Sequence, residues 1–497
     1  MAPSSGPLDD LRFLLRIRPV QLGTLTGFLA VIGGISFYLK YCVLDFDIWW
    51  HLKVGDWILG HFAVPHTGIL SRSAANRPWV AYSWGYEVLL SGAYQWFGLL
   101  GIGIFGTLLT LAIAYTIYWM LHRLSGRFWV ALPLTAVVCS AFLFNGMPRP
   151  FFFSIVMFCV VLTLLLEANR SGRIEPLYWL PLIFLLWVNL HIQFIYGLFI
   201  VGLVVGVNLA QRIATTLNAA PDFLLTSTLP LGKLIAIFVS CVLATLLGPN
   251  FYHPYLAVFE YSKAKFSYAI IIELQPLTFR GFSHYAELML TAFGFFAVGW
   301  RRKIDLFKLA MLTVCSVVAY RTMRDAWFIC IPAAACIADF PAKEEEADKP
   351  ETLFENAGVA VAVVIFLFLV AQRTDFTERG LDRVVSANYP VDAVNFLRRN
   401  PVPGPLYNGL NWGGFLMWYM PDYPVAIDGR NDLYGDDLDK IFYKTENADD
   451  TYPSDPYLEE SGVVLLESVS PLAKVLTTDP RFQLIYQDSL AVVFARR

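Results

Sequence analysis

Residues 43–53, VLDFDIWWHLK, form a stretch in which two aspartates are followed by two tryptophans. It begins at the end of the apolar, nearly uncharged segment 22–43, which is long enough to cross a bilayer core of about 30 Å as a helix. A carboxylate is costly to desolvate, so a pair of them beside a membrane helix is expected to have a partner or a function. Asp45 and Asp47 are therefore the first candidate functional residues.

The composition of the whole chain is that of a membrane protein. Of its 497 residues, 57% are hydrophobic and 15% are charged, well below the roughly 25% charged residues of soluble domains. The formal net charge of −3, without a Lys/Arg-rich run, gives no indication of nucleic-acid binding. All seven cysteines lie within or beside apolar segments, so neither a disulfide framework nor a cysteine metal site is expected.

Apolar segments of membrane-spanning length recur along the chain and predict about eleven transmembrane helices. They lie at 22–43, 98–121, 128–144, 151–168, 177–193, 194–211, 230–248, 284–300, 304–320, 326–340 and 355–371. The boundaries between helices at His191 and Arg321 are less clearly marked, because the turns elsewhere contain Pro and Gly. The predicted fold class is a polytopic α-helical membrane protein.

Basic residues predict the side that each loop faces, because cytoplasmic loops are enriched in Lys and Arg. Alternate loops carry Arg12, Arg16, Arg18, Arg123, Arg127, Arg170, Arg173, Arg212 and the run 301–303. If these are cytoplasmic, the long loops 44–97 and 249–283 lie outside, and an odd number of helices sends the tail to the same outer face.

Two domains are predicted: a transmembrane domain over 1–371 and a small soluble α/β domain over 372–497. The tail shows helical spacing at 391–399 and again at 470–476. Its predicted strands are 424–427, 462–466, 484–486 and 491–494. In the first outer loop, 48–59 is predicted to form a helix at the membrane surface, where tryptophans are favoured.

The residues alone leave two interpretations of the aspartate pair open. In an extended loop, Asp45 and Asp47 project to one side, where together they can bind a divalent cation or accept a proton from an attacking hydroxyl. Alternatively, they cap the helix over 48–59, since negative charge is favourable at a helix N-terminus.

The order of these features resembles the start of GT-C glycosyltransferases. A first helix is followed by an Asp-x-Asp motif and bulky aromatics, as in the catalytic subunits of oligosaccharyltransferases. Further blocks match a set of bacterial GT-C-like membrane proteins, at 56–59, 77–79, 84–87, 149–150, 186–191, 250–252, 320–321, 411–415 and 428–434. The resemblance implies a GT-C-like fold in the bacterial inner (cytoplasmic) membrane, with the C-terminal domain extracytoplasmic.

The resemblance also implies a function. In that family an outward acidic motif after the first helix carries the catalytic base, which assigns the catalytic role to Asp45 and Asp47. The implied reaction moves a sugar from a polyprenyl-phosphate-linked donor to a glycan, lipid or protein acceptor by an inverting path. The expected partners are this donor and membrane lipid. No cofactor is required, although a divalent cation at the two aspartates stays open. A lipid-linked-saccharide transporter or flippase and a non-catalytic assembly subunit are the alternatives.

Other polar residues on the predicted outer face are candidate ligands of the substrate. Guanidinium and ammonium groups suit phosphate oxygens, and the predicted donor-phosphate ligands are Arg149, Arg321, Arg324 and Lys263. The predicted substrate contacts are His51, Asn189, His191, Trp412, Asp428 and Arg430. His253 with Glu273 is a further candidate metal or acid–base pair.

These candidates also have structural interpretations. Arginines at helix ends commonly reach to lipid headgroups. Polar groups around 189–193 can join helices by hydrogen bonds, and 428–430 can form a tight turn with an Asp–Arg pair. The family's acidic residue is missing from the Trp-rich motif at 412–415, which argues against an Asn-x-Ser/Thr acceptor.

Overall fold

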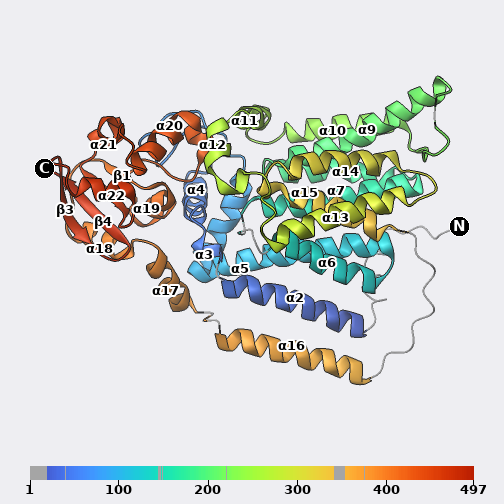
Figure 1. The fold of residues 1–497 in the computed structure, drawn as a ribbon, viewed down its shortest axis with the longest axis horizontal. Coiled ribbons are helices and arrows are strands. Elements are labelled where there is room, and N and C mark those ends of the chain that lie inside the picture. The colour runs from blue at the N-terminus through green and yellow to red at the C-terminus, as the bar shows by residue number, and fades with distance from the viewer. Residues whose placement is uncertain are drawn as a thin grey trace.

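The computed structural model describes residues 19–39, 41–143, 147, 149–219, 221–340, 353–373, 375 and 377–497. Within this part of the chain, a bundle of long helices carries a smaller α/β domain at one end (Figure 1). The predicted cytoplasmic residues Arg12, Arg16 and Arg18 lie outside the described residues.

Each apolar segment predicted to cross the membrane is helical in the described chain. The helices are α2 (Pro19–Leu39), α5 (Trp84–Ser125), α6 (Phe128–Phe142), α7 (Phe151–Ser171), α8 (Leu180–Val188), α9 (Phe194–Thr216), α10 (Leu231–Thr245), α13 (Phe282–Gly299), α14 (Leu306–Ala319), α15 (Trp327–Ala338) and α16 (Leu353–Arg373).

Their lengths do not confirm the predicted count of spans. Among the described residues, 4 helical segments are both long and apolar enough to cross a membrane: Val20–Leu44, Trp84–Ser125, Phe151–Ser171 and Phe194–Thr216. Several other apolar helices, α6, α10 and α14 among them, are shorter. The chain is a multi-pass membrane protein, and the number of crossings stays a prediction.

The weak break at His191 is a true break between helices. The helix predicted over 177–193 ends earlier, because α8 stops at Val188 and α9 starts at Phe194. The Asn189 amide donates to the carbonyl of Leu185, and the Asn189 carbonyl accepts the N–H of Gly85 in α5 at 2.9 Å. These bonds draw the chain out of the helix, so Asn189 and Gln193 lie in a turn and do not share a helical face.

Several short elements cover the end of the bundle that carries the α/β domain (Figure 1). They are α3 (Tyr41–Leu44), α4 (Ile48–His61), α11 (His253–Tyr261), α12 (Lys265–Ile270), η3 (Ile272–Leu274) and η4 (Met323–Asp325). The helix predicted over 48–59 is confirmed as α4. Asp47 stands at its N-cap position, but the side chain caps none of its N–H groups.

At the same end, α5 bends sharply at Gly98, where φ is 60° and ψ is −144°. The bend frees the first N–H groups of the next helical segment. Glu378, at the start of α17 (Glu378–Asn388), accepts the N–H of Leu99 at 2.8 Å and that of Leu100 at 2.9 Å. Its carboxylate caps the positive end of this segment and attaches α17 to the bundle.

The α/β domain contains one mixed sheet in the order β1-β2-β4-β3. Its strands are β1 (Leu406–Asn408), β2 (Val463–Glu467), β3 (Phe482–Gln487) and β4 (Ala491–Arg496). Only the β1–β2 pair is parallel. The domain's further helices are α18 (Val391–Arg399), η5 (Leu410–Trp412), α19 (Gly413–Tyr419), α20 (Asn431–Glu446), α21 (Pro456–Glu459) and α22 (Pro471–Leu476).

The predicted strands of the tail are confirmed except for 424–427, which does not join the sheet. The Asn408 side chain, at the end of β1, accepts the N–H of Ala426 at 2.8 Å and donates to the carbonyl of Ile427 at 2.8 Å. Because this amide takes the place of a neighbouring strand, Val425, Ala426 and Ile427 are buried without sheet partners. Val425 bridges to Ser71 of the first outer loop instead.

The α/β domain is docked on the bundle by both outer loops. In the first loop, Arg77 forms two hydrogen bonds with Asp437 of α20, at 3.0 and 3.1 Å. In the second, the N–H groups of Phe266 and Ser267 in α12 donate to Asp436 of α20. The turn before α4 is thereby enclosed between the bundle and the α/β domain.

Candidate active site

The aspartate pair forms an ion-pair cluster with an arginine. Arg149, in the turn before α7, donates from Nε to Asp45 Oδ2 at 2.7 Å and from Nη2 to Asp45 Oδ1 at 2.8 Å. The same Nη2 lies 3.1 Å from Asp47 Oδ2. The 45–47 segment is a tight turn rather than an extended loop, because the Asp47 N–H donates to Asp45 Oδ1 at 3.1 Å. The two carboxylates nevertheless meet on one guanidinium group.

Two further charged residues extend the cluster. Glu273 of η3 accepts from Arg149 Nη1 at 3.2 Å, and Arg324 Nη1 of η4 lies 3.7 Å from the same Glu273 oxygen. Three carboxylates and two guanidinium groups are thus gathered from four separate segments of the chain. Among the predicted phosphate ligands, the structure brings Arg149 and Arg324 together at the aspartates.

The two aspartates differ in how far solvent reaches them. The side chain of Asp45 is 1% exposed, whereas that of Asp47 is 21% exposed and that of Glu273 is 42% exposed. Asp45 is therefore enclosed behind Arg149, and Asp47 is the aspartate that an incoming molecule can reach.

Burial and charge set the protonation of this cluster. Burial raises the pKa of Asp47 to about 6, against the opposing effects of Arg149 and of the Trp50 N–H, which donates to Asp47 Oδ1 at 3.1 Å. For Arg149, burial favours the neutral form, but the carboxylates of Asp45 and Asp47 outweigh it and raise its pKa. At neutral pH the arginine is charged and Asp47 is mostly ionised, with a stronger affinity for protons than an ordinary aspartate.

His51 lies behind Asp47 and does not join the ion pairs. Its Nδ1 stands 3.2 Å from Glu87 Oε1 of α5, and its ring stacks on that of Trp50. Both His51 and Glu87 are buried, and burial followed by the charge of Arg149 lowers the pKa of His51 well below its ordinary value. A neutral His51 supports Trp50, which in turn bonds to Asp47. Its predicted contact with substrate stays a prediction.

Asn189 and His191 connect helices of the bundle. Asn189 Oδ1 accepts the indole N–H of Trp84 at 3.0 Å, and His191 Nδ1 lies 2.9 Å from the hydroxyl of Ser154. Ser154 also accepts the indole N–H of Trp187 at 2.8 Å. These contacts agree with the structural interpretation of this turn, although substrate contact is not tested by them.

Arg321 and Lys263 lie apart from the ion pairs described above. Both side chains are exposed, with Arg321 5.3 Å from the ring centre of Tyr268 and Lys263 3.8 Å from that of Phe259. Their predicted role as phosphate ligands stays a prediction. His253 bonds to the carbonyl of Asn250, while Glu273, its predicted partner, pairs with arginines.

In the α/β domain, Asp428 and Arg430 form a fully buried pair. Arg430 donates from Nε and Nη2 to the two oxygens of Asp428, each at 2.8 Å, and Tyr434 donates to Asp428 as well. Arg430 Nη2 also donates to the carbonyl of Ile69 in the first outer loop at 2.9 Å. Trp412 is buried too. The predicted substrate contact of Trp412, Asp428 and Arg430 is untested, and in this structure the Asp428–Arg430 pair joins the domain to the first outer loop.

The aspartate pair was also a candidate for holding a divalent cation. Among the described residues, no group of three or more His, Cys, Asp or Glu side chains is arranged to hold a metal ion. The carboxylates of Asp45 and Asp47 are instead directed at the guanidinium group of Arg149. Both carboxylates are thus paired with an arginine, and this arrangement does not fit a bound cation.

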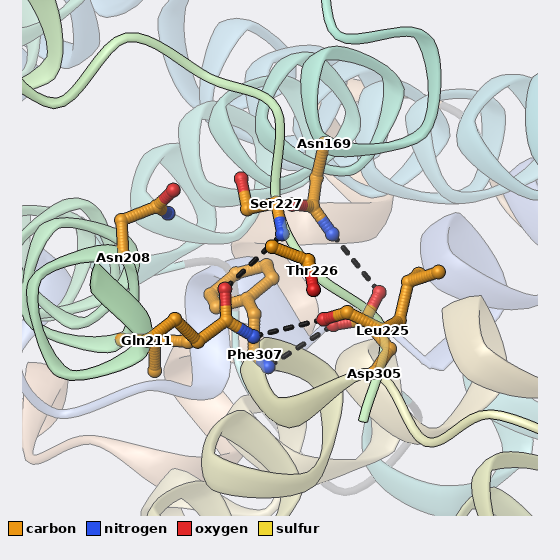
Figure 2. A pocket seen from close by; sticks show the side chains of 9 residues that line it. Asn169, Asn208, Gln211, Leu225, Thr226, Ser227, Asp305 and Phe307 are labelled. Atoms are coloured by element: carbon orange, nitrogen blue, oxygen red, sulfur yellow. Dashed lines mark hydrogen bonds between the residues drawn. The ribbon is translucent and has the colours of Figure 1, made fainter. Parts of the chain in front are cut away.

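A small polar cavity lies far from this cluster, among residues of α7, α9, the loop before α10 and the start of α14 (Figure 2). It encloses about 10 Å³, which is room for about one water molecule. Its polar groups bond to each other, as in the Asn169–Asp305 hydrogen bond of 2.9 Å and the Gln211–Ser227 hydrogen bond of 3.1 Å. It is a structural feature of the opposite end of the bundle.

Glu87, Gly414 and Gly429 lie within segments that carry the resemblance, but none of them is predicted as a site residue. Gly429 lies against Asp47, and Gly414 lies against the backbone of Phe46 and Trp50. The docking of the α/β domain on α4 brings the two glycines against the 45–47 turn, whereas Glu87 reaches His51 from α5.

No family model and no curated protein matches the chain. Among solved structures, the fold is similar to that of ArnT from Cupriavidus metallidurans, whose crystal structure is bound to undecaprenyl phosphate. The TM-score is 0.46 and the sequence identity 12%, over 94% of this chain and 97% of that chain. This likeness concerns the fold alone.

Proposed function

We propose that this chain is a GT-C-type glycosyltransferase. It transfers a sugar from a polyprenyl-phosphate-linked donor to a hydroxyl of a glycan, lipid or protein acceptor at the extracytoplasmic face of the membrane. The observation that carries the proposal is the cluster of Asp45, Asp47, Arg149, Glu273 and Arg324. It combines an accessible carboxylate with two guanidinium groups at one end of a bundle of apolar helices.

The two aspartates have different roles in this proposal. Asp45 is enclosed and bonded twice to Arg149, so it positions the guanidinium group and keeps it charged. Asp47 is accessible, and its raised pKa makes it a better proton acceptor than an ordinary aspartate. Asp47 is therefore the proposed general base.

The proposed step is a single displacement. The oxygen of the acceptor hydroxyl attacks the anomeric carbon of the sugar and forms the new glycosidic bond, while its proton passes to the Asp47 carboxylate. The bond between the anomeric carbon and the phosphate oxygen breaks at the same time. Its electron pair leaves with the polyprenyl phosphate, so the anomeric configuration is inverted.

The arginines stabilise the charge that develops on the leaving phosphate. Arg149 Nη1 donates to Glu273 Oε1 at 3.2 Å, and Arg324 Nη1 lies 3.7 Å from the same oxygen. Glu273 is the most exposed acid of the cluster, so its carboxylate marks a position where two guanidinium groups converge on one negative charge. A phosphate oxygen that enters this position would be held by both groups.

The position of the cluster suits a donor with a lipid tail. It lies where the apolar helices give way to the polar outer loops, so a phosphate can bind the arginines while its polyprenyl chain stays in the bilayer. A transporter or flippase and a non-catalytic subunit remain the alternatives, and they predict that Asp47 has no chemical role.

The test is an assay of sugar transfer by the purified protein in liposomes. The liposomes contain radiolabelled sugars linked to polyprenyl phosphate as donors. Membranes of cells that lack the protein supply the acceptors. Asp47→Asn is expected to lower the transfer rate by about 10²–10⁴-fold, the usual contribution of a general base. Asp56→Asn, on the same helix and paired only with Lys53 among the described residues, is the matched control and should leave the rate unchanged.

Two results would contradict the proposal. If Asp47→Asn transfers sugar as fast as the native protein, Asp47 is not the base. If the native protein releases no polyprenyl phosphate but moves the labelled lipid across the bilayer, the chain is a transporter.

A further inference from the structure

The backbone of the α/β domain lies directly against the 45–47 turn at two glycines. A Cβ atom added to Gly429 would overlap Asp47 Oδ1 and would stand 3.1 Å from Asp47 Cγ and 3.2 Å from Trp50 Nε1. A Cβ added to Gly414 would stand 2.9 Å from the carbonyl oxygen of Phe46 and 3.0 Å from the backbone nitrogen of Trp50. At either position, a residue larger than glycine fits only if neighbouring atoms move.

The two close approaches differ in what a new side chain would meet. At Gly429 it would meet the far end of the Asp47 side chain, which can rotate away. At Gly414 it would meet backbone atoms, which cannot move without displacing the domain. Gly429 is not among the described residues with positive φ, so its conformation does not require glycine, and only the contact with Asp47 does.

Rigid contacts hold Gly429 at this position. Its neighbours Asp428 and Arg430 form the buried ion pair, and Arg430 is bonded to the carbonyl of Ile69 at 2.9 Å. On the other side of the contact, Trp49 is fully buried among rings of the α/β domain. The backbone around Gly429 therefore forms a fixed wall against Asp47.

We propose that Gly429 is a positioning residue of the site. Because it has no side chain, the α/β domain closes directly onto the carboxylate of Asp47 and holds it between Trp50 and Arg149. The carboxylate has one orientation available in which it accepts from the Trp50 indole and lies against Arg149. The α/β domain thus completes the site, and the catalytic consequence of this contact rests on the proposed function.

The contact itself is tested without an activity assay by a double-mutant cycle in thermal unfolding. Gly429→Ala is expected to lower the Tm by roughly 2 °C or more, since the methyl group displaces the Asp47 carboxylate from its partners. In an Asp47→Ala background, the overlapping oxygen is gone, and Gly429→Ala should change the Tm by much less. Gly414→Ala is the matched contrast, because its overlap is with backbone and is not relieved by Asp47→Ala.

Equal effects of Gly429→Ala in the two backgrounds would overturn the proposal whatever the function of the chain. So would a Gly429→Ala protein whose Tm and activity are both native. Gly60→Ala, in α4, meets no atom within 4 Å, and this glycine control should not lower the Tm, because alanine is favoured in a helix.

Sugar transfer provides the second readout. Gly429→Ala is expected to lower kcat by at least about tenfold, because small displacements of a catalytic group are costly. It should also move the acid limb of the pH–rate profile to higher pH. Trp50 and Arg149 both favour the ionised form of Asp47, and their interactions with it would be weakened. A variant that is merely less stable would lose active protein without moving this limb.

The outcomes separate the two proposals. If Asp47→Asn abolishes transfer while Gly429→Ala leaves the acid limb and kcat unchanged, the positioning role is wrong and the transferase function stands. If the cycle shows the coupling but Asp47→Asn transfers sugar normally, the contact is real and the proposed function is wrong.

Discussion

Arg149 donates two hydrogen bonds to the carboxylate of Asp45, from Nε at 2.7 Å and from Nη2 at 2.8 Å, across a sequence separation of 104 residues. The pair joins the turn before α4 to the turn before α7. Because Asp45 is almost fully buried, its charge is tolerated only with this partner. The pair is therefore both a structural link and the support of the neighbouring Asp47.

Removing the guanidinium group leaves a buried carboxylate without its counter-charge. Arg149→Ala is expected to destabilise the protein by about 3 kcal/mol or more, and Arg149→Lys by less, since lysine keeps the charge but not the two parallel bonds. Thermal unfolding in detergent measures both. Arg280→Ala, an exposed arginine of the second outer loop, is the control and should be neutral. Native stability of Arg149→Ala would show that the pair is not a structural link between the two turns.

The pH dependence of transfer follows from the pKa of Asp47. A general base must be ionised, and burial raises the pKa of Asp47 from its ordinary 3.8 to about 6. The value of kcat/KM is therefore expected to fall below about pH 6, where an ordinary aspartate would remain active. A pH–rate profile measures this, and an acid limb near pH 4 would contradict the raised pKa of Asp47.

The same pKa shift of Asp47 makes the folded protein less stable as the pH rises, whereas the activity increases. Because the folded chain favours protonated Asp47, its contribution to stability is fully present below pH 3.8 and is lost as the pH rises through about 6. At the pH at which Asp47 is ionised and can act as a base, it therefore lowers the stability of the protein.

Much of this site could be predicted from local sequence. Asp45 and Asp47 stand out because charge directly after an apolar helix requires a reason, and Arg149 because it precedes one. The role of Glu273 could not be predicted, since its meeting with Arg149 and Arg324 depends on two loops far apart in the chain. Nothing in the sequence around Gly429 indicates that it contacts Asp47.

The fold, too, could be predicted where local sequence determines it, but not where it depends on distant contacts. Hydropathy located the helices because each must present apolar side chains along its whole length. It did not predict that 424–427 stays out of the sheet, because that depends on one amide, Asn408, which lies elsewhere in the chain. It also did not indicate that apolar helices such as α6 and α10 are shorter than α7 and α9.

Asp439 predicts a second pH effect, at the junction of α20 with α12. Its side chain is buried beside Ser267, with Asp432, Asp436 and Asp437 nearby, and burial followed by the charge of Asp436 raises its pKa to about 7. Its contribution to stability is present below its ordinary pKa of 3.8 and is lost as the pH rises through about 7. Asp439→Asn is therefore expected to stabilise the protein at pH 8, on the order of 3 kcal/mol.

The measurement is the Tm of both proteins across this pH range. Asp436→Asn should have the opposite effect, because N–H groups of Phe266 and Ser267 outweigh burial and lower the pKa of Asp436. An Asp439→Asn protein whose advantage does not grow with pH would show that Asp439 is not protonated in the fold.

Trp49 is expected to be the main apolar anchor of the α/β domain. Its ring is fully buried, with ring centres of Tyr389, Phe415 and Tyr419 at 5.6, 5.7 and 5.5 Å. Trp49→Ala is expected to cost about 3–5 kcal/mol and to lower transfer, since the wall against Asp47 loses its support. Thermal unfolding and the transfer assay measure the two effects. Trp96→Ala, largely exposed, should change neither.

The side of the membrane on which the site lies is testable by cysteine labelling. The seven native cysteines are buried, so a membrane-impermeant maleimide should not react with them in the folded protein. Two cysteine variants report on the two sides of the membrane. Val469→Cys lies in the α/β domain, and Leu217→Cys follows α9 near the basic loops. Each replaces a residue that is 70% exposed. In spheroplasts the first variant should react at once and the second only after permeabilisation, because Lys and Arg keep their loops in the cytoplasm. If the first variant also required permeabilisation, Asp47 would face the cytoplasm and could not meet an extracytoplasmic donor.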